Sequence, residues 1–273
     1  MSRYNAGKEA VTLAILAAKK QQGERLTMIT CYDGAFARLL DDAGIDIVLV
    51  GDSLGNVVLG FENTLAVTMD HMLHHTAAVS RVMNKPFLVM DMPFFAYNIS
   101  VEQAMANGAR AVQEGGAQAV KMEGGHHILP QVTALTKAGI PVMGHVGLTP
   151  QSVHAMSGYK LQGRGERGRQ ILAEAKALED AGAFAIVLEL IPAELAREIT
   201  AALTVPTIGI GAGLQCSGQV LVLHDMLGFD PGFRPKFLKQ YAQLGNDITN
   251  AVKAYVKDVR DGTFPGPENS FSG

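Results

Sequence analysis

Several acidic side chains stand at the ends of short apolar runs in this sequence of 273 residues. Asp52, Asp91 and Glu123 close or soon follow such runs, and Glu189 lies within another. Removing a carboxylate from water costs free energy unless the group is paired or bound to a cation. Acids that meet at one place therefore indicate a cation, and hard oxygen ligands suit Mg²⁺, which keeps positions for water and substrate oxygens. We take Asp52, Asp91 and Glu123 as the candidate metal ligands.

A basic side chain accompanies these acids. Lys121 stands two residues before Glu123, and residues two apart on a strand share a face. Lys121 is predicted to pair with Glu123 or to neutralise a substrate carboxylate or oxyanion, and the two roles are compatible. For each acid taken alone, a helix cap or an ion pair is an equal alternative. His145 and the pair His224-Asp225 also end apolar runs, and their roles stay open.

Eight apolar runs of four to six residues supply the strands that must position these groups. They are Leu26–Cys31, Ile47–Val50, Phe87–Met90, Ala119–Met122, Pro141–His145, Ala185–Leu190, Thr207–Ile210 and Gln219–His224. Continuous apolar strands that alternate with helices predict a parallel sheet covered on both faces. Eight such units predict an α/β fold, a (βα)8 TIM barrel, with additional helices over Lys8–Gln21 and Pro235–Val259. In this fold the strands' C-terminal ends carry the chemistry, which is where the acids fall.

Two connections leave questions open. Only eight residues separate Ile210 from Gln219, which is short for a crossover helix. Either that helix is reduced to a turn or two or one strand is misassigned, and a doubly wound open sheet is the alternative fold. Residues 147–168 form a long segment rich in Gly and polar residues, typical of a lid or binding loop. No linker divides the chain, so we predict one barrel domain over residues 1–273.

Composition limits the class and the compartment. Hydrophobic residues make up 48% of the chain and charged residues 18%, which excludes a disordered or fibrous protein. A net charge of −3 without a long basic run argues against a nucleic-acid partner. Cys31 and Cys216 are the only thiols, which indicates a reducing cytosol. Residues 199–223 carry no charge, yet Pro206 and several glycines favour strands and turns over a membrane span. We predict a cytoplasmic protein with no membrane partner.

Two further patterns are weaker. GIGAG at 209–213 resembles a dinucleotide fingerprint but lacks the third-glycine spacing and opens no clear βαβ unit. Close backbone packing is the preferred interpretation. His71, His74 and His75 have helical metal-ligand spacing, but no further zinc ligand is evident, so a structural role is favoured.

Seven ordered motifs are spread along the chain, and the match that they carry runs through nearly all of it. They are VGDSLGNVVLG at 50–60, VKMEGG at 120–125, GHVGLTPQSV at 144–153, GYKLQGRG at 158–165, VLELIP at 187–192, IGIGAG at 208–213 and VLHDMLG at 222–228. With these motifs the sequence resembles the ketopantoate hydroxymethyltransferase (3-methyl-2-oxobutanoate hydroxymethyltransferase) family. The resemblance implies a (βα)8 barrel and a cytoplasmic homodecamer.

The resemblance also implies an activity. A hydroxymethyl unit passes from 5,10-methylenetetrahydrofolate to 3-methyl-2-oxobutanoate through a Mg²⁺-stabilised enolate, giving 2-dehydropantoate (ketopantoate) in pantothenate biosynthesis. The partners are thus a small oxoacid and a folate. Carried over by position, the metal-binding residues are Asp52, Asp91 and Glu123, the substrate-binding residues are Asp52, Ser53, Asp91 and Lys121, and the catalytic base is Glu189.

The nearest competing enzyme is a Mg²⁺-dependent oxoacid C–C lyase or decarboxylase of the isocitrate lyase/phosphoenolpyruvate mutase type. It also places acids at strand ends around Mg²⁺ and an oxoacid enolate. Such lyases characteristically carry a catalytic cysteine in a KKCG-like loop, which this sequence lacks. A silent ligand-binding barrel is a further alternative, although it has no need of desolvated acids.

Overall fold

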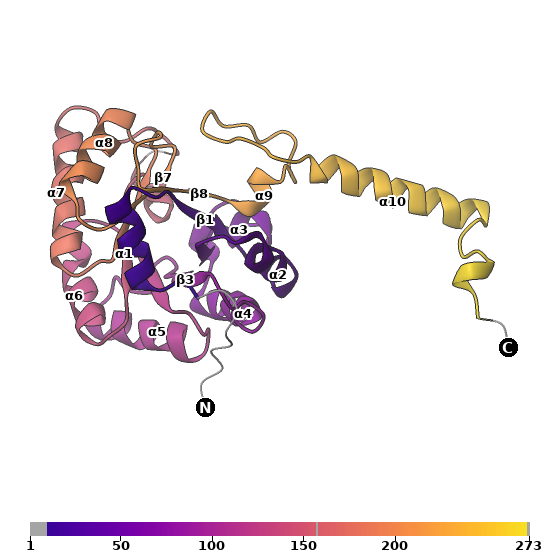
Figure 1. The fold of residues 1–273 in the computed structure, drawn as a ribbon, viewed down its shortest axis with the longest axis horizontal. Helices are drawn as coiled ribbons and strands as arrows, with labels where there is room; N and C mark the ends of the chain where they lie inside the picture. The colour runs from indigo at the N-terminus through magenta and orange to yellow at the C-terminus, as the bar shows by residue number, and fades with distance from the viewer. Residues whose placement is uncertain (1–9, 157, 272–273) are drawn as a thin grey trace. The chain divides into compact units, whose positions relative to one another are not determined.

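The computed structural model of the protein describes residues 10–156 and 158–271. Its eight parallel strands close into a barrel whose neighbours follow chain order, and helices surround this barrel (Figure 1). β8 pairs with β1, so the sheet has no free edge. The strands are β1 Leu26–Thr30, β2 Ile47–Val50, β3 Phe87–Asp91, β4 Ala119–Glu123, β5 Val142–Gly147, β6 Ala185–Glu189, β7 Thr207–Ile210 and β8 Gly218–Leu221. The predicted (βα)8 TIM barrel is confirmed, and the alternative fold, a doubly wound open sheet, is wrong.

The helices α1, α2, α4 and α5 begin at capping residues that the sequence supplies. Ser100 accepts a hydrogen bond from Gln103 N at the start of α5, and Asp33 accepts from Ala35 N at the start of α2. Such caps satisfy N–H groups that have no partner inside the helix. The α-helices are α1 Leu13–Gln22, α2 Gly34–Ala43, α3 Leu54–Val57, α4 Met69–Ser80, α5 Val101–Gln113, α6 Leu129–Lys137, α7 Glu166–Asp180, α8 Ala193–Ala202, α9 Leu223–Met226 and α10 Leu244–Asp261. The 3₁₀ helices are η1 Thr64–Ala66, η2 His126–Ile128, η3 Pro150–Ser152 and η4 Pro267–Asn269.

The barrel interior has an apolar layer beneath a polar one. On β3, Phe87 and Val89 belong to the buried core cluster, and Asp91 follows on the same face because strand side chains alternate. On β6, Val187 belongs to the same cluster, and Glu189 follows it in the same way. The core thus fills one end of the barrel, and charged groups occupy the C-terminal ends of the strands.

The connection between β7 and β8 holds bends and turns over residues 211–217 instead of a helix. A Cβ on Gly209 would lie 2.8 Å from Cys216 Sγ, so the chain folds back tightly where only glycine fits. Of the two alternatives, the misassigned strand is wrong, since β7 and β8 pair as neighbours, and the crossover is even shorter than the turn or two of helix in the other. GIGAG accordingly serves close packing of the backbone.

Both terminal helices differ from their predicted bounds. α10 begins at Leu244 instead of Pro235, because residues 241–245 donate backbone hydrogen bonds to carbonyl groups of residues 226–228. Helical periodicity in the sequence does not reveal that competing pairing. α1 begins at Leu13, directly after its N-cap residue Thr12, and the predicted start at Lys8 lies outside the described residues.

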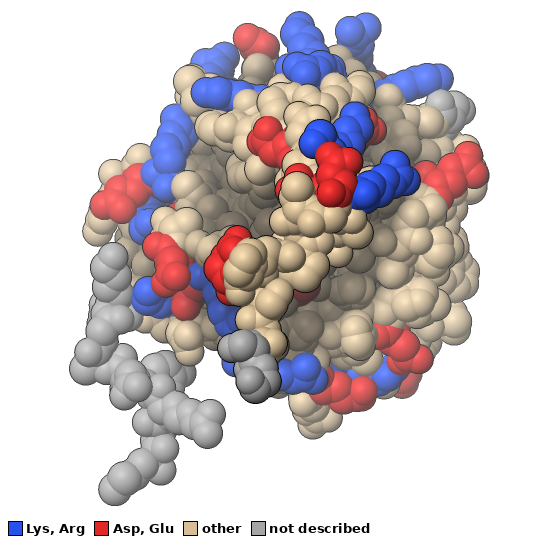
Figure 2. All heavy atoms as spheres, turned by 90° about the vertical axis from the view of Figure 1, so that its right-hand side faces the viewer, with Lys and Arg blue, Asp and Glu red and all other residues tan. Residues whose placement is uncertain are grey.

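The chain divides into two compact units, Met1–Val222 and Leu223–Gly273. All eight strands lie in the first unit, and α9, α10 and η4 lie in the second. One domain over residues 1–273 stays a prediction. Across the residues that the structure describes, no helix combines the length and apolar character that a membrane span requires. On the face drawn in Figure 2, Lys and Arg side chains lie interspersed with Asp and Glu side chains.

Candidate active site

Strand register brings the predicted groups of β3 and β4 together. Asp91 is the register partner of Lys121, and Lys121 Nζ lies 2.6 Å from both carboxylate oxygens of Asp91. The same Nζ lies 3.7 Å from Glu123 Oε1, and all three side chains are buried. Burial alone would lower the pKa of Lys121, but the carboxylates of Asp91, Glu123 and Asp52 raise it above its usual value. Lys121 is therefore a fixed buried cation.

His145 on β5 links the acids of β4 and β6. Its Nδ1 lies 3.3 Å from Glu123 Oε1 and its Nε2 lies 3.2 Å from Glu189 Oε2, without the alignment of a hydrogen bond. Burial lowers the pKa of His145, but the nearby acids, chiefly Glu123, outweigh burial and raise this pKa to about 9. Burial likewise raises the pKa of Glu123, while His145 and Lys121 bring it below its usual value. A charged imidazole thus stands between two carboxylates, a role that the sequence left open.

Asp52 and Ser53 enter the site from the turn after β2. Asp52 is buried, and its backbone N–H donates to Asp91 Oδ2 over 3.4 Å. Burial raises the pKa of Asp52 well above its usual value, and the charges of Asp91 and Glu123 raise it further. Ser53 Oγ lies 2.9 Å from Tyr32 OH. The structure therefore brings Asp52, Asp91, Lys121 and Glu123 together, as expected.

The donor set fits a hard divalent cation. Among the described residues, no three His, Cys, Asp or Glu side chains already form a complete metal-binding group, and Lys121 holds both oxygens of Asp91. Asp52 is nevertheless buried and has no ion-pair partner within 4 Å among the described residues, and burial, then the charges of Asp91 and Glu123, raise its pKa, so its carboxylate adds an excess of negative charge here. A cation would relieve that excess, and Mg²⁺ commonly takes only one or two carboxylates beside water and substrate oxygens.

Two buried side chains from the connections between strands complete the site, and neither was predicted as a site residue. Tyr97 OH donates toward Gln151 Oε1 over 2.9 Å and accepts from Glu123 N over 3.1 Å. Gln151 lies on η3, within the long segment after β5. The only signal for Gln151 was its place in the motif GHVGLTPQSV. In the same segment, burial raises the pKa of Tyr159, and the charges of Asp52 and Glu189 raise it further. A lid role for residues 147–168 stays a prediction.

The predicted structural histidines have structural partners. His71 completes a capping box with Thr68 at the start of α4, and His75 Nδ1 lies 2.6 Å from Tyr32 O. These contacts account for two of the three histidines in the HMLHH segment. The structural interpretation of that segment is supported.

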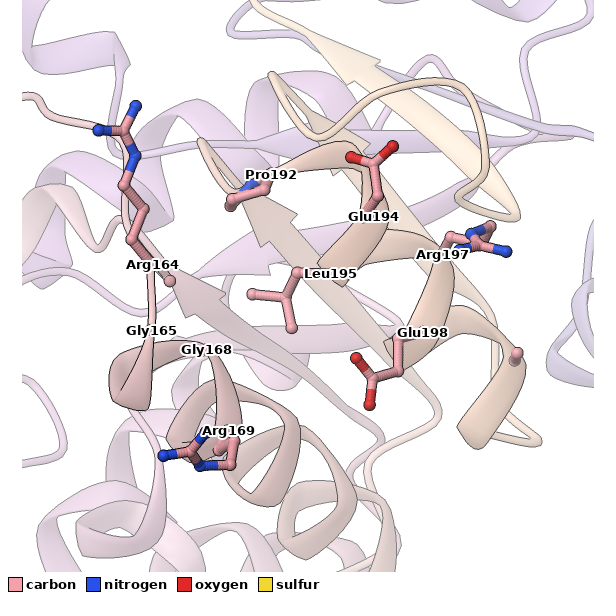
Figure 3. Close-up of a pocket in the computed structure, with 11 residues that line it drawn as sticks. Arg164, Gly165, Gly168, Arg169, Pro192, Glu194, Leu195, Arg197 and Glu198 are labelled. Atoms are coloured by element: carbon pink, nitrogen blue, oxygen red, sulfur yellow. The ribbon is translucent and has the colours of Figure 1, made fainter.

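A separate cavity of about 630 Å³ lies beside the start of α7 and along α8. Figure 3 shows Leu195 at its centre, with Glu194, Arg197 and Glu198 on one side and Arg169 on another. Arginine and glutamate side chains both line it. None of the predicted site residues lines this cavity.

The two thiols should be inert in the native protein. Cys31 and Cys216 are buried, and burial raises the pKa of Cys31 to about 11 and also raises that of Cys216. Because the thiolate is the reactive form, an aromatic disulfide reagent at pH 8 should label neither thiol until the protein is unfolded in guanidinium. The extent of labelling is measured by the absorbance of the aromatic thiolate that the reagent releases. Rapid labelling of the native protein would contradict it.

With this geometry in place, comparison with known proteins decides the family. The family model described as ketopantoate hydroxymethyltransferase matches residues 10–267. The chain belongs to the ketopantoate hydroxymethyltransferase family. The 3-methyl-2-oxobutanoate hydroxymethyltransferase of Thermoanaerobacter sp. (strain X514) is 55% identical over 265 residues, 97% of either chain. That of Syntrophus aciditrophicus (strain SB) is 53% identical over 272 residues, covering 99% of this chain and all of its own.

Solved structures show the same barrel at low identity. A putative phosphonomutase from Burkholderia cenocepacia J2315 superposes with a TM-score of 0.62 at 17% identity, covering 92% of this chain and 98% of its own. A phosphonopyruvate hydrolase gives a TM-score of 0.60 at 15% identity, covering 96% and 92%. These likenesses show the fold alone. The family and the class of transferase predicted from the sequence are confirmed as those of the ketopantoate hydroxymethyltransferases.

Proposed function

We propose that the protein transfers a hydroxymethyl unit from 5,10-methylenetetrahydrofolate to 3-methyl-2-oxobutanoate, giving 2-dehydropantoate, in cytoplasmic pantothenate biosynthesis. The observation that carries the proposal is the convergence of Glu189 with the buried group of Asp91, Lys121 and Glu123 at one end of the barrel. Forming an oxoacid enolate requires a base and a place for negative charge, and this convergence offers both. Membership of the family supports the two substrates.

The cofactor in this proposal is Mg²⁺, held by Asp52, Asp91 and Glu123. When bound, it supplies a Lewis acid that polarises the keto oxygen and acidifies the proton on C3. The burial of Asp52 without an ion-pair partner within 4 Å among the described residues supports a cation in this place.

Two side chains bind the oxoacid together with Asp52 and Asp91. Lys121 Nζ, fixed against Asp91, neutralises the substrate carboxylate or the oxyanion that develops. Ser53 Oγ, fixed by Tyr32 OH at 2.9 Å, hydrogen-bonds the substrate and orients it toward the folate.

Glu189 removes the proton from C3. Its Oε2 lies 3.2 Å from His145 Nε2, while its Oε1 accepts no hydrogen bond from the described residues. The imidazole therefore faces one oxygen as an ion-pair partner and leaves the other to take the proton. Leu148 N donates to Glu189 O over 2.9 Å, which fixes the backbone from which the carboxylate extends.

Hydrogen exchange tests this function without folate. In D₂O, 3-methyl-2-oxobutanoate with the protein and Mg²⁺ should lose its C3–H signal in proton NMR far faster than with Mg²⁺ alone. Adding 5,10-methylenetetrahydrofolate should then give 2-dehydropantoate. No exchange above the metal-only background would contradict the enolate step. The lyase alternative has only its fold in support, and it predicts cleavage products instead.

The proposal includes assembly into a homodecamer. Ile248, Val252, Tyr255 and Val259 recur at helical spacing on α10, and all are exposed. Such a helix is marginal in water without a surface against its apolar face, and no residue of α10 is buried in the described chain. This stripe supports contact with another copy of the chain.

A charge on this stripe should disrupt the assembly. Val252→Asp should lower the mass measured by light scattering, because a carboxylate cannot be buried in an apolar contact. Asn250→Asp places the same side chain on the opposite side of α10 and should leave the mass unchanged. A wild-type mass for Val252→Asp would count against α10 as the contact.

A further inference from the structure

Gln151 occupies an unusual position between the strands of the site. It lies on η3 between β5 and α7, and it is 7% exposed. Its side chain and its backbone N–H make hydrogen bonds to groups from three other segments of the barrel. We infer that Gln151 is a positioning residue that orients the carboxylates of Asp52 and Glu123 for cation binding. This inference rests on the proposed function.

The side-chain amide of Gln151 fixes Asp52. Its Nε2 donates to Asp52 Oδ2 and to Met92 O, each over 2.9 Å. Its Oε1 accepts from Tyr97 OH over 2.9 Å. Because both ends of the amide have partners of the correct polarity, the amide has one orientation. Asp52 Oδ2 is thereby held, and Oδ1 accepts no hydrogen bond from the described residues, so it is the oxygen presented to a cation.

The backbone of Gln151 fixes the second carboxylate. Its N–H donates to Glu123 Oε2 over 3.0 Å. Glu123 Oε1 faces Lys121 and His145, at 3.7 Å and 3.3 Å. Each oxygen of Glu123 therefore has its own neighbours, and the carboxylate plane is determined by them. One residue thus connects an acid after β2 with an acid at the end of β4.

Few other side chains could take this place. A methionine side chain has a similar length but no N–H group. In Gln151→Met, Asp52 would therefore lose its hydrogen-bond donor, while the space of the glutamine side chain stays filled. An asparagine is one methylene shorter and cannot reach both Asp52 and Met92 from the same backbone. The backbone N–H is present in both variants, so they remove side-chain contacts, including the one with Asp52, and keep the donor to Glu123.

The test is metal affinity, measured by calorimetric titration of the full-length protein with Mg²⁺ and Mn²⁺, with and without 3-methyl-2-oxobutanoate. Groups that orient metal ligands typically contribute 10- to 100-fold in affinity. Gln151→Met and Gln151→Asn should therefore weaken metal binding by roughly 10-fold or more. Their unfolding midpoints in EDTA should stay close to each other, and excess metal should restore most of the C3–H exchange.

Gln131 provides the matched control. It is 8% exposed, and its Nε2 donates to Tyr97 O over 3.3 Å, but it contacts neither acid. Gln131→Met should bind metal as the wild type does. If the Gln151 variants also keep wild-type affinity, Gln151 does not position the ligands. If the wild type itself binds no metal in any titration, the proposed function fails first, and this inference with it.

Discussion

Glu189→Gln should lower the rate of C3 deuterium exchange in 3-methyl-2-oxobutanoate by roughly 10²- to 10⁴-fold, the usual contribution of a positioned general base. The amide keeps the size and shape of the carboxylate but cannot accept the proton. The backbone at this position is fixed by Leu148 N, so the substitution should not displace the strand end. Proton NMR in D₂O with saturating Mg²⁺ measures the rate.

The control for this prediction is a Glu→Gln substitution outside the proposed site. Glu194→Gln, on the surface at the start of α8, should leave exchange unchanged. Oxoacid and metal affinities of Glu189→Gln should stay near those of the wild type, because Glu189 is not among the proposed ligands. Exchange at the wild-type rate in this variant would assign proton abstraction to another group.

Lys121→Met should destabilise the metal-free protein by about 3 to 5 kcal/mol, the range for removing one partner of a buried ion pair. Asp91 would then have no cation within 4 Å among the described residues, since Lys121 is its only ion-pair partner there. Guanidinium unfolding in EDTA, followed by circular dichroism, measures the free energy. Mg²⁺ should restore part of the loss, because ligands that bind only the native state stabilise it.

The loss in Lys121→Met should be larger at pH 8 than at pH 5. Burial already raises the pKa of Asp91 in the native protein, although Lys121 opposes that shift. Without Lys121 the native pKa rises further above the unfolded value. When the native pKa of a carboxyl lies above its unfolded pKa, the free energy of unfolding of the protein falls as pH rises from the unfolded pKa through the native pKa.

Lys257→Met supplies the control for this prediction. Lys257 pairs with Asp261 in an exposed position on α10, where an ion pair contributes less than about 1 kcal/mol. An unfolding free energy of Lys121→Met equal to that of Lys257→Met would show that the buried pair does not stabilise the barrel.

The strands and their acids were predictable because the barrel imposes simple rules. The strands β2 to β5 are buried along their whole length, so both of their faces are covered and most of their residues are apolar, and β2 and β7 have the predicted bounds. Side chains alternate along a strand, so Lys121 and Glu123 had to share a face. The family resemblance added the role of Glu189, which position alone did not assign.

Other parts depend on contacts between distant segments, which local sequence does not specify. Tyr97 and Gln151 lie between the strands, in a loop and on η3, and their importance arises from their contacts with each other and with Glu123. The role of His145 required knowing that acids of both neighbouring strands meet its ring. The late start of α10 follows from backbone pairing around residue 241, which competes with the helix.

The register of β3 and β4 has a consequence for how this gene can vary. Asp91 meets Lys121 only because these residues are partners in the ladder and both side chains point inward. A single inserted or deleted residue in β4 would turn every later side chain of that strand to the opposite face. Lys121 and Glu123 would then face the helices. Insertions should therefore accumulate in loops away from the strand ends. If a library of length variants were selected for growth, the surviving variants should carry no insertions or deletions within the strands.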